Sequence, residues 1–103
     1  MTAYYVQPPL PPFQTHSATS RAAAIAFLPK VGTTRRRVFD HIQSMGDYGA
    51  TDEEVQEALH MSGNTERPRR VELGRGRLIK EAGFRRRTRA GVEAEVYVAK
   101  EAL

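Results

Sequence analysis

The chain has 103 residues, which leaves room for one small domain and argues against a large internal active-site cavity. Its 16 Lys and Arg residues against 12 Asp and Glu give a net charge of +4, which favours acidic partners such as nucleic acid. Cysteine is absent, which excludes disulfides, thiolate metal sites and cysteine nucleophiles. Without a long apolar run or a signal-peptide pattern, we expect a soluble, cytoplasmic protein with no membrane contact.

Residues 1–16 are rich in proline and aromatic residues, and they contain four of the six prolines. Because proline opposes both helix and central strand, this segment is predicted to be a tail. Its Pro8–Pro12 run matches a proline-rich peptide ligand, although such matches are common by chance. Three aromatic residues could instead dock on the body of the protein or on a second copy: Tyr4, Tyr5 and Phe13.

Residues 17–28 combine capping residues with strong helix formers, which predicts a short helix that stops at Pro29. A connector to residue 32 completes this 17–32 segment. A second helix is then predicted from a cap at Thr33 or Thr34 to a stop at Gly46. Its apolar stripe comprises Val38, Phe39, Ile42 and Met45.

The segment that begins at Thr51 has the pattern of a helix start. Thr51 and Glu54 form a capping box, and the acidic residues between them complement the helix dipole. Val55, Ala58 and Leu59 supply an apolar stripe. These features predict a third helix.

A turn at 60–63 and a cap at Ser62 or Asn64 predict a fourth helix from about Asn64 to Arg75. Pro68 is tolerated most easily in the first helical turn, so the helix is expected to begin near Asn64 or Thr65. An earlier start would require a kink.

The C-terminal part of the chain is predicted to form β structure. Residues 78–83 are interpreted as a short strand and turn, and residues 84–89 and 93–99 as a hairpin around Ala90-Gly91. Val96 and Val98 would face one side, with Glu95 and Tyr97 on the other. The expected fold is mainly α with a C-terminal β-hairpin, an α+β class.

Several segments resemble winged helix-turn-helix domains, especially those of small proteins encoded by actinobacterial phages. The segments are Gly49–Val55, Ala58–Met61, Asn64–Leu73, Leu78-Ile79 and, at the tip of the wing, Thr88–Gly91. The resemblance implies that residues 33–103 form a DNA-binding domain, located in the host cytoplasm if the protein is phage-encoded. It departs at Gly76-Arg77, because related sequences place glycine immediately before Leu-Ile.

The charge of the chain is unevenly distributed. Residues 64–89 carry ten cationic and three acidic side chains, a net charge of +7, which leaves −3 for the rest. Nine of those ten cations are arginine, whose planar fork suits phosphate and guanine. This pattern favours double-stranded DNA as the partner.

In this fold class the fourth helix would enter the major groove with its N-terminal residues nearest the bases. Placing Leu73 in the core puts Arg67 and Arg75 on the opposite side, where they are the better groove candidates. Arg69 and Arg70 would lie on the flanks, where they reach phosphates or pair with Glu53, Glu54 or Glu57. The predicted DNA-binding residues of this helix are Asn64, Thr65, Arg67, Arg69, Arg70 and Arg75.

Strand alternation divides the arginines of the predicted wing between two faces. Arg85, Arg87 and Arg89 share one face and are the predicted DNA contacts, whereas Arg86 lies on the other face. Residues 35–37 are three further arginines, interpreted equally well as a solvated helix start or a clamp on the DNA backbone.

The sequence does not indicate an enzyme. No two of the three histidines have metal-ligand or acid-base spacing, and phosphate-loop, nucleophile-elbow and zinc motifs are absent. We therefore expect no cofactor, metal or catalytic residue. The leading hypothesis is a sequence-specific transcription regulator, in which residues 1–28 would form a homodimer or bind a protein partner. The alternatives are a sequence-tolerant accessory factor in recombination, replication or packaging, and a winged helix that binds a host protein.

Overall fold

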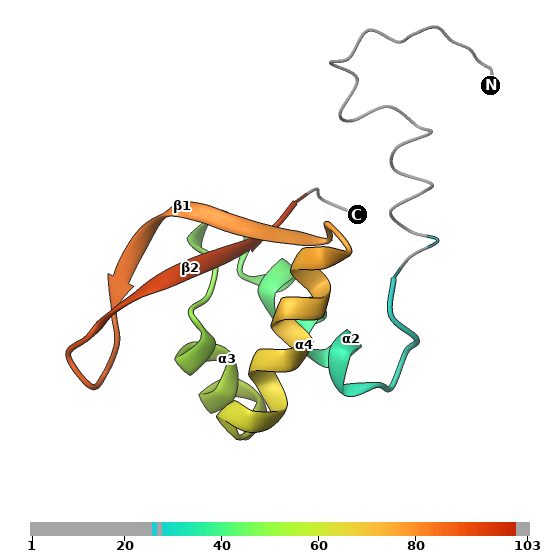
Figure 1. Cartoon of the computed structure of the whole chain (residues 1–103), viewed down its shortest axis with the longest axis horizontal. Helices are drawn as coiled ribbons and strands as arrows, with labels where there is room; N and C mark the ends of the chain where they lie inside the picture. The colour runs from blue at the N-terminus through green and yellow to red at the C-terminus, as the bar shows by residue number, and fades with distance from the viewer. Residues whose placement is uncertain (1–25, 27, 101–103) are drawn as a thin grey trace, which may run out of the picture.

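The structure is a computed structural model that describes residue 26 and residues 28–100. Within that range, three α-helices precede a two-stranded antiparallel hairpin, which confirms the predicted α+β class (Figure 1). The predicted tail at 1–16 lies outside the described residues. So does the predicted helix at 17–28, apart from Ala26, which is helical, and Leu28, which is not. The elements are α2 (Thr34–Ser44), η1 (Gly46–Tyr48), α3 (Asp52–Leu59), α4 (Gly63–Arg75), β1 (Ile79–Arg87) and β2 (Glu93–Ala99).

Helix α2 supplies the centre of the core. Thr33 is its N-cap, and the Thr33 side chain accepts a hydrogen bond from the Arg36 amide at 3.2 Å. The helix ends at Ser44, slightly before the predicted stop, and Met45 becomes its C-cap. Three of the four predicted core residues of this helix are fully buried: Val38, Phe39 and Ile42.

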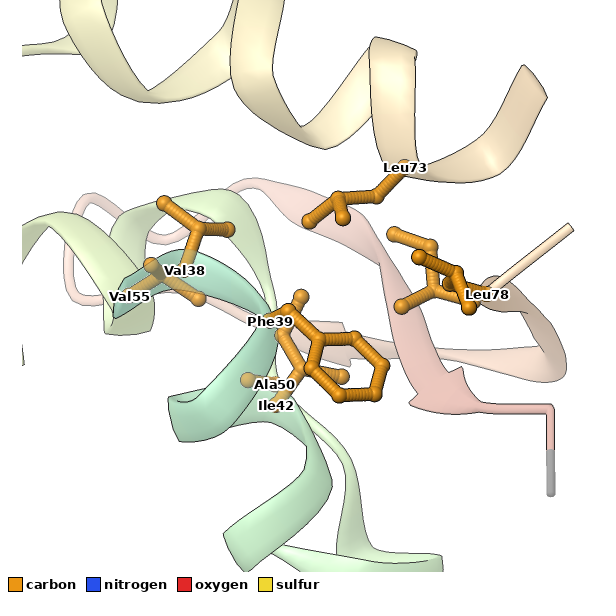
Figure 2. Close-up of a cluster of buried hydrophobic side chains, with 8 residues drawn as sticks. Val38, Phe39, Ile42, Ala50, Val55, Leu73 and Leu78 are labelled. Atoms are coloured by element: carbon orange, nitrogen blue, oxygen red, sulfur yellow. The ribbon is translucent and has the colours of Figure 1, made fainter. Parts of the chain in front are cut away.

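The core lies between α2, α4 and the start of the hairpin (Figure 2). Phe39 is its largest side chain, and burial of such a side chain contributes roughly 1.5–3 kcal/mol. Met45 and Leu59 pack at its edge. No helix in the described part of the chain is long and apolar enough to cross a membrane. The buried cluster comprises Val38, Phe39, Ile42, Ala50, Val55, Leu73, Leu78 and Ile79.

A short bridge joins the segment before α3 to the hairpin. Ala50 and Tyr97 exchange two backbone hydrogen bonds of 2.9 Å each. The preceding Gly49 has φ +66°, and a Cβ there would lie 2.6 Å from the Tyr97 carbonyl oxygen. Only glycine fits this close approach of two backbones. The bridge therefore fixes the hairpin against the helices.

Helix α4 begins at Gly63, one residue earlier than expected. Ser62 is the N-cap, and its side chain accepts from the Thr65 amide at 3.2 Å. Pro68 consequently lies in the helix interior, which corrects the prediction that it would lie in the first turn. The cap determines the start, and the helix continues through the proline although its missing N–H removes one hydrogen bond.

The hairpin has a longer first strand than predicted. Residues 79–87 form one continuous strand, so the separate strand and turn expected at 78–83 are wrong. Between Glu81 and Arg85 the register shifts, because four steps along β1 match two along β2. Gly83, with φ +94°, lies in this bulge rather than in a chain-reversing turn. The strand stops at Arg87, which leaves Arg89 in the turn.

Candidate nucleic-acid interface

Helices α3 and α4 form a compact two-helix unit. Three residues separate them, and His60 adopts the left-handed conformation that ends α3. The predicted capping box of α3 is confirmed, since Thr51 accepts from the Glu54 amide at 3.2 Å and Glu54 accepts from the Thr51 amide at 3.0 Å. A tight turn with a cap on each side holds the two helices at a defined angle.

The outer face of α4 is free of core contacts. Only Glu66 and Leu73 of this helix are fully buried. The face opposite Leu73 is exposed, as the helical periodicity predicted. Its residues are Asn64, Arg67, Pro68, Val71 and Arg75.

Two of the predicted contact residues are instead engaged in ion pairs. Arg70 donates two hydrogen bonds to Asp52, of 3.0 and 2.8 Å, and its guanidinium carbon lies 4.6 Å from the centroid of the Tyr97 ring. Arg69 donates to Glu72 on the same helix at 2.9 Å. Both side chains are thus directed to the protein.

The expected partners of Arg69 and Arg70 were wrong. Glu54 binds Arg86, while Glu53 and Glu57 bind Arg89. These three acidic residues of α3 therefore contact the hairpin and not α4. Asp52, which opens α3, is the residue that meets Arg70.

Asp52 remains ionised under ordinary conditions. Its burial opposes ionisation, but hydrogen bonds with Arg70 and Glu66 outweigh the burial and hold the pKa of Asp52 below its usual value. The Asp52–Arg70 pair is therefore a lasting link between the two helices.

Arg67 and Arg75 remain available. The Arg67 side chain is 60% exposed, and it makes a long ion pair in which its Nε lies 4.0 Å from Asp52 Oδ2, without a hydrogen bond. For the side chain of Arg75, no hydrogen bond or ion pair exists within the described range. Asn64 and Thr65 are exposed at the N-terminal end of the same helix. These residues make up the most accessible polar surface of α4.

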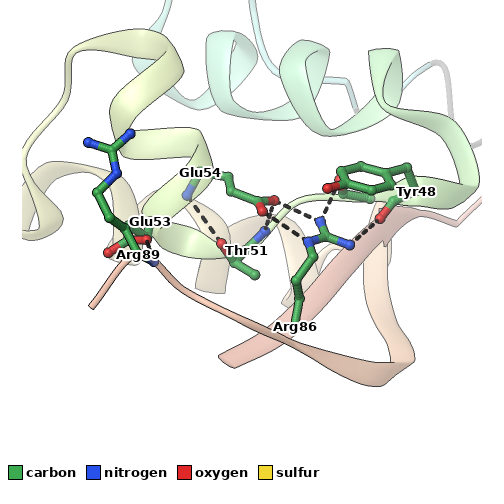
Figure 3. A network of polar contacts seen from close by, with 7 residues as sticks. Tyr48, Thr51, Glu53, Glu54, Arg86 and Arg89 are labelled. Atoms are coloured by element: carbon green, nitrogen blue, oxygen red, sulfur yellow. Dashed lines mark hydrogen bonds and ion pairs between the residues drawn. The ribbon is translucent and has the colours of Figure 1, made fainter. Parts of the chain in front are cut away.

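Arg86 points inward from β1 and joins the hairpin to α3 (Figure 3). Its guanidinium donates to the two carboxylate oxygens of Glu54 at 2.7 and 2.9 Å, and to the carbonyls of Tyr48 and Gly49 at 3.1 and 3.2 Å. It also stacks on the Tyr48 ring, 3.9 Å from the centroid. Sequence reasoning did not assign Arg86 this role, although strand alternation had separated it from the other arginines of the wing.

The hairpin turn is also tied to α3. The Arg89 amide donates to Glu53 at 2.8 Å (Figure 3). The Arg89 guanidinium donates to Glu57 at 3.2 Å. Arg87 donates to the Gly91 carbonyl at 2.9 Å within the turn. Arg85 pairs with Glu95 across the hairpin. All three predicted arginines stay exposed, but each already has a partner in the protein.

The three arginines at 35–37 are likewise engaged. Arg35 pairs with Glu72 of α4 at 2.9 Å, and Arg36 pairs with Asp40. Arg37 donates to the carbonyl of Leu59 at the end of α3, at 3.2 Å. These contacts link α2 to α3 and α4, a role beyond the two interpretations left open by the sequence.

The described residues of α4 and the hairpin present a cationic surface. No group of three His, Cys, Asp or Glu residues within them is arranged to hold a metal ion. Compared with known proteins, the chain matches no family, no curated protein and no solved structure. The geometry of the site must therefore carry the functional argument.

Proposed function

We propose that this chain is a winged helix-turn-helix protein that binds double-stranded DNA and acts as a sequence-specific regulator. The observation that carries the proposal is that the arginines of α4 fall into two groups, one bound to other residues of the protein and one on the exposed face of the helix. Arg69 and Arg70 are used to assemble the domain, whereas Arg67 and Arg75 extend from the helix face opposite Leu73. A helix of 13 residues is about 20 Å long, and the major groove admits an α-helix.

The order of elements supports the same proposal. Helix α2, a short bridge at Ala50, helices α3 and α4 and then the hairpin follow in the sequence typical of winged helices. The hairpin would serve as the wing, with Arg85, Arg87 and Arg89 contacting the phosphate backbone. Backbone contacts of this kind position a protein on DNA and contribute affinity more than sequence choice.

The direct test is selection from a random-sequence duplex library at two salt concentrations, followed by sequencing of the retained DNA. A specific regulator enriches a motif and loses binding steeply at higher salt, because cationic contacts release counterions. Retention without a motif would favour the accessory factor. No retention at low salt would contradict DNA binding and favour a protein-binding module.

Single substitutions should separate base contacts from phosphate contacts. We expect Arg67→Ala to reduce discrimination between the selected motif and a single mismatch by roughly tenfold, since one base contact contributes about 1–3 kcal/mol. Arg87→Ala should weaken binding to all sequences alike. It should also reduce, by about 1, the slope of the logarithm of the binding constant against the logarithm of the salt concentration, called the salt slope below. Fluorescence anisotropy over a salt series measures both quantities.

Lys30→Ala provides the matched control, because Lys30 is an exposed cation in the connector before α2. It should change neither discrimination nor salt slope beyond the small effect of net charge. Indistinguishable binding by the Arg67, Arg87 and Lys30 variants and the parent would contradict the proposed DNA face.

A further inference from the structure

A cleft of about 430 Å³ lies between the C-terminal half of α4 and the base of the hairpin. Its volume falls in the range of small-molecule sites. Four of the residues that line it are cationic, and one is acidic. Arg70 lies in α4, and Arg77 follows the end of that helix. Lys80 lies in β1, and Lys100 follows β2.

Most of this charge has no partner in the protein. Arg70 is held by Asp52, but the structure gives the side chains of Arg77, Lys80 and Lys100 no hydrogen bond or ion pair within residues 28–100. The acidic side chain of the cleft, Glu81, has none there either. Together these four groups carry a net charge of +2. Cations gathered around one hollow repel each other, so an anion bound among them would relieve that repulsion.

The backbone at Arg77 is a second, independent observation. Arg77 has φ +62°, a left-handed conformation that glycine adopts without strain and arginine does not. The neighbouring Gly76 has φ −78°, where glycine is not required. Glycine at 77 would relieve this strain, so the arginine side chain at this position is a candidate for a role in the cleft.

The walls of the cleft suit a polar ligand with a flat apolar part. Gly74 has no side chain to fill the cleft that it lines, and a Cβ added there would meet no atom within 4 Å. Val71 and Ile79 supply apolar surface. Burial raises the pKa of the Tyr97 hydroxyl, so it stays protonated and can donate a hydrogen bond.

We propose that this cleft is a phosphate-binding site, with Arg77, Lys80 and Lys100 as its ligands. A phosphate monoester carries a charge of about −1.5 to −2 at neutral pH. This charge is opposite in sign and similar in size to the net charge of the four cleft side chains that have no partner in the described residues. Arginine's planar fork binds phosphate oxygens in pairs. The group can come from a free nucleotide or from the DNA backbone, and the site does not depend on the proposed DNA-binding function.

The test uses the full chain labelled with ¹⁵N and titrated with deoxyadenosine monophosphate and with inorganic phosphate at constant ionic strength. Saturable shifts are expected at the amides of residues 76–81. Arg77→Gly should weaken binding at least fivefold and, at the same time, raise Tm by roughly 4–8 °C. A loss of binding together with a gain in stability cannot arise from misfolding. Lys80→Ala should also weaken binding.

His60→Gly is the matched control, because His60 is the other described non-glycine residue with positive φ. It should raise Tm similarly and leave phosphate affinity unchanged. Absence of saturable shifts, or equal affinity in the parent and Arg77→Gly, would overturn the proposal.

A competition experiment identifies the source of the phosphate. If the nucleotide displaces a duplex that lacks terminal phosphates, the cleft receives the DNA backbone; if both bind together, it receives a free phosphate ester. Either result supports the site. Because nucleotide binding is measured without DNA, failure of DNA binding leaves this test intact.

Discussion

Replacing Arg86 with alanine is expected to lower the free energy of unfolding by about 1–3 kcal/mol, the cost of leaving partly buried acceptors without their donor. The Arg86 side chain is only 19% exposed, and it satisfies the Glu54 carboxylate and two backbone carbonyls. Its removal leaves the carbonyls of Tyr48 and Gly49 without this donor, and it leaves Glu54 with the Thr51 amide but without its ion pair. The stacking on Tyr48 is lost as well. Chemical denaturation of parent and variant measures the difference.

Arg85→Ala is the matched control from the next position on β1. Arg85 pairs with Glu95 at 3.1 Å, but its side chain is 61% exposed, and surface pairs contribute about 0–1 kcal/mol. The two variants remove the same group from adjacent residues of one strand. Equal losses of stability would show that Arg86 is not the anchor that the contacts indicate.

The effect of Arg86 should depend on pH. Its hydrogen bonds are the main reason that the pKa of Glu54 lies below the usual value. A group with a lowered folded-state pKa stabilises the fold above its unfolded pKa, and that contribution is lost as pH falls through the folded pKa. The stability gap between parent and Arg86→Ala should therefore narrow in acid, below about pH 4.

Local patterns in the sequence predicted the helices of this domain well. The capping box at Thr51 and the exposed face of α4 depend on residues three or four positions apart, and the helical repeat alone brings such residues together. The fold class followed from the same signals.

Contacts between distant elements could not be predicted in this way. Arg86 and Glu54 are 32 positions apart, and their pairing depends on the bridge that fixes the hairpin beside α3. Gly83 misled the strand prediction because glycine serves turns and bulges equally. Sequence identified most of the cationic residues, but only the structure separates Arg67 and Arg75 from the arginines already engaged.

Glu66→Gln is expected to stabilise the protein at pH 8 by about 1–3 kcal/mol, in an order-of-magnitude conversion of its pKa shift. Glu66 is fully buried in α4, and burial raises its pKa to about 7. Its Oε1 accepts from Gln56 at 3.0 Å, while Oε2 meets no donor in the described structure. That arrangement suits a protonated carboxyl that donates to Asp52, and glutamine keeps the shape and a donor without the charge.

The sign of the pH dependence follows from the raised pKa of Glu66. Between about pH 4.5 and 7 the folded state holds a proton that the unfolded state has released, so stability falls as pH rises through this window. The advantage of Glu66→Gln should be absent near pH 4.5 and complete above pH 7. Glu93→Gln is the control, because it makes the same change of charge at an exposed position of β2 that has no ion pair in the described structure; its effect on stability should be small.

Thermal unfolding of the parent, Glu66→Gln and Glu93→Gln from pH 4.5 to 8 measures the trend. A Glu66→Gln advantage that stays constant over this range would contradict a raised pKa. Glu66 precedes Arg67, accepts a hydrogen bond from Gln56 of α3 and interacts with Asp52 of the same helix. Its ionisation would therefore weaken the contact between α3 and α4, the helix proposed to read DNA.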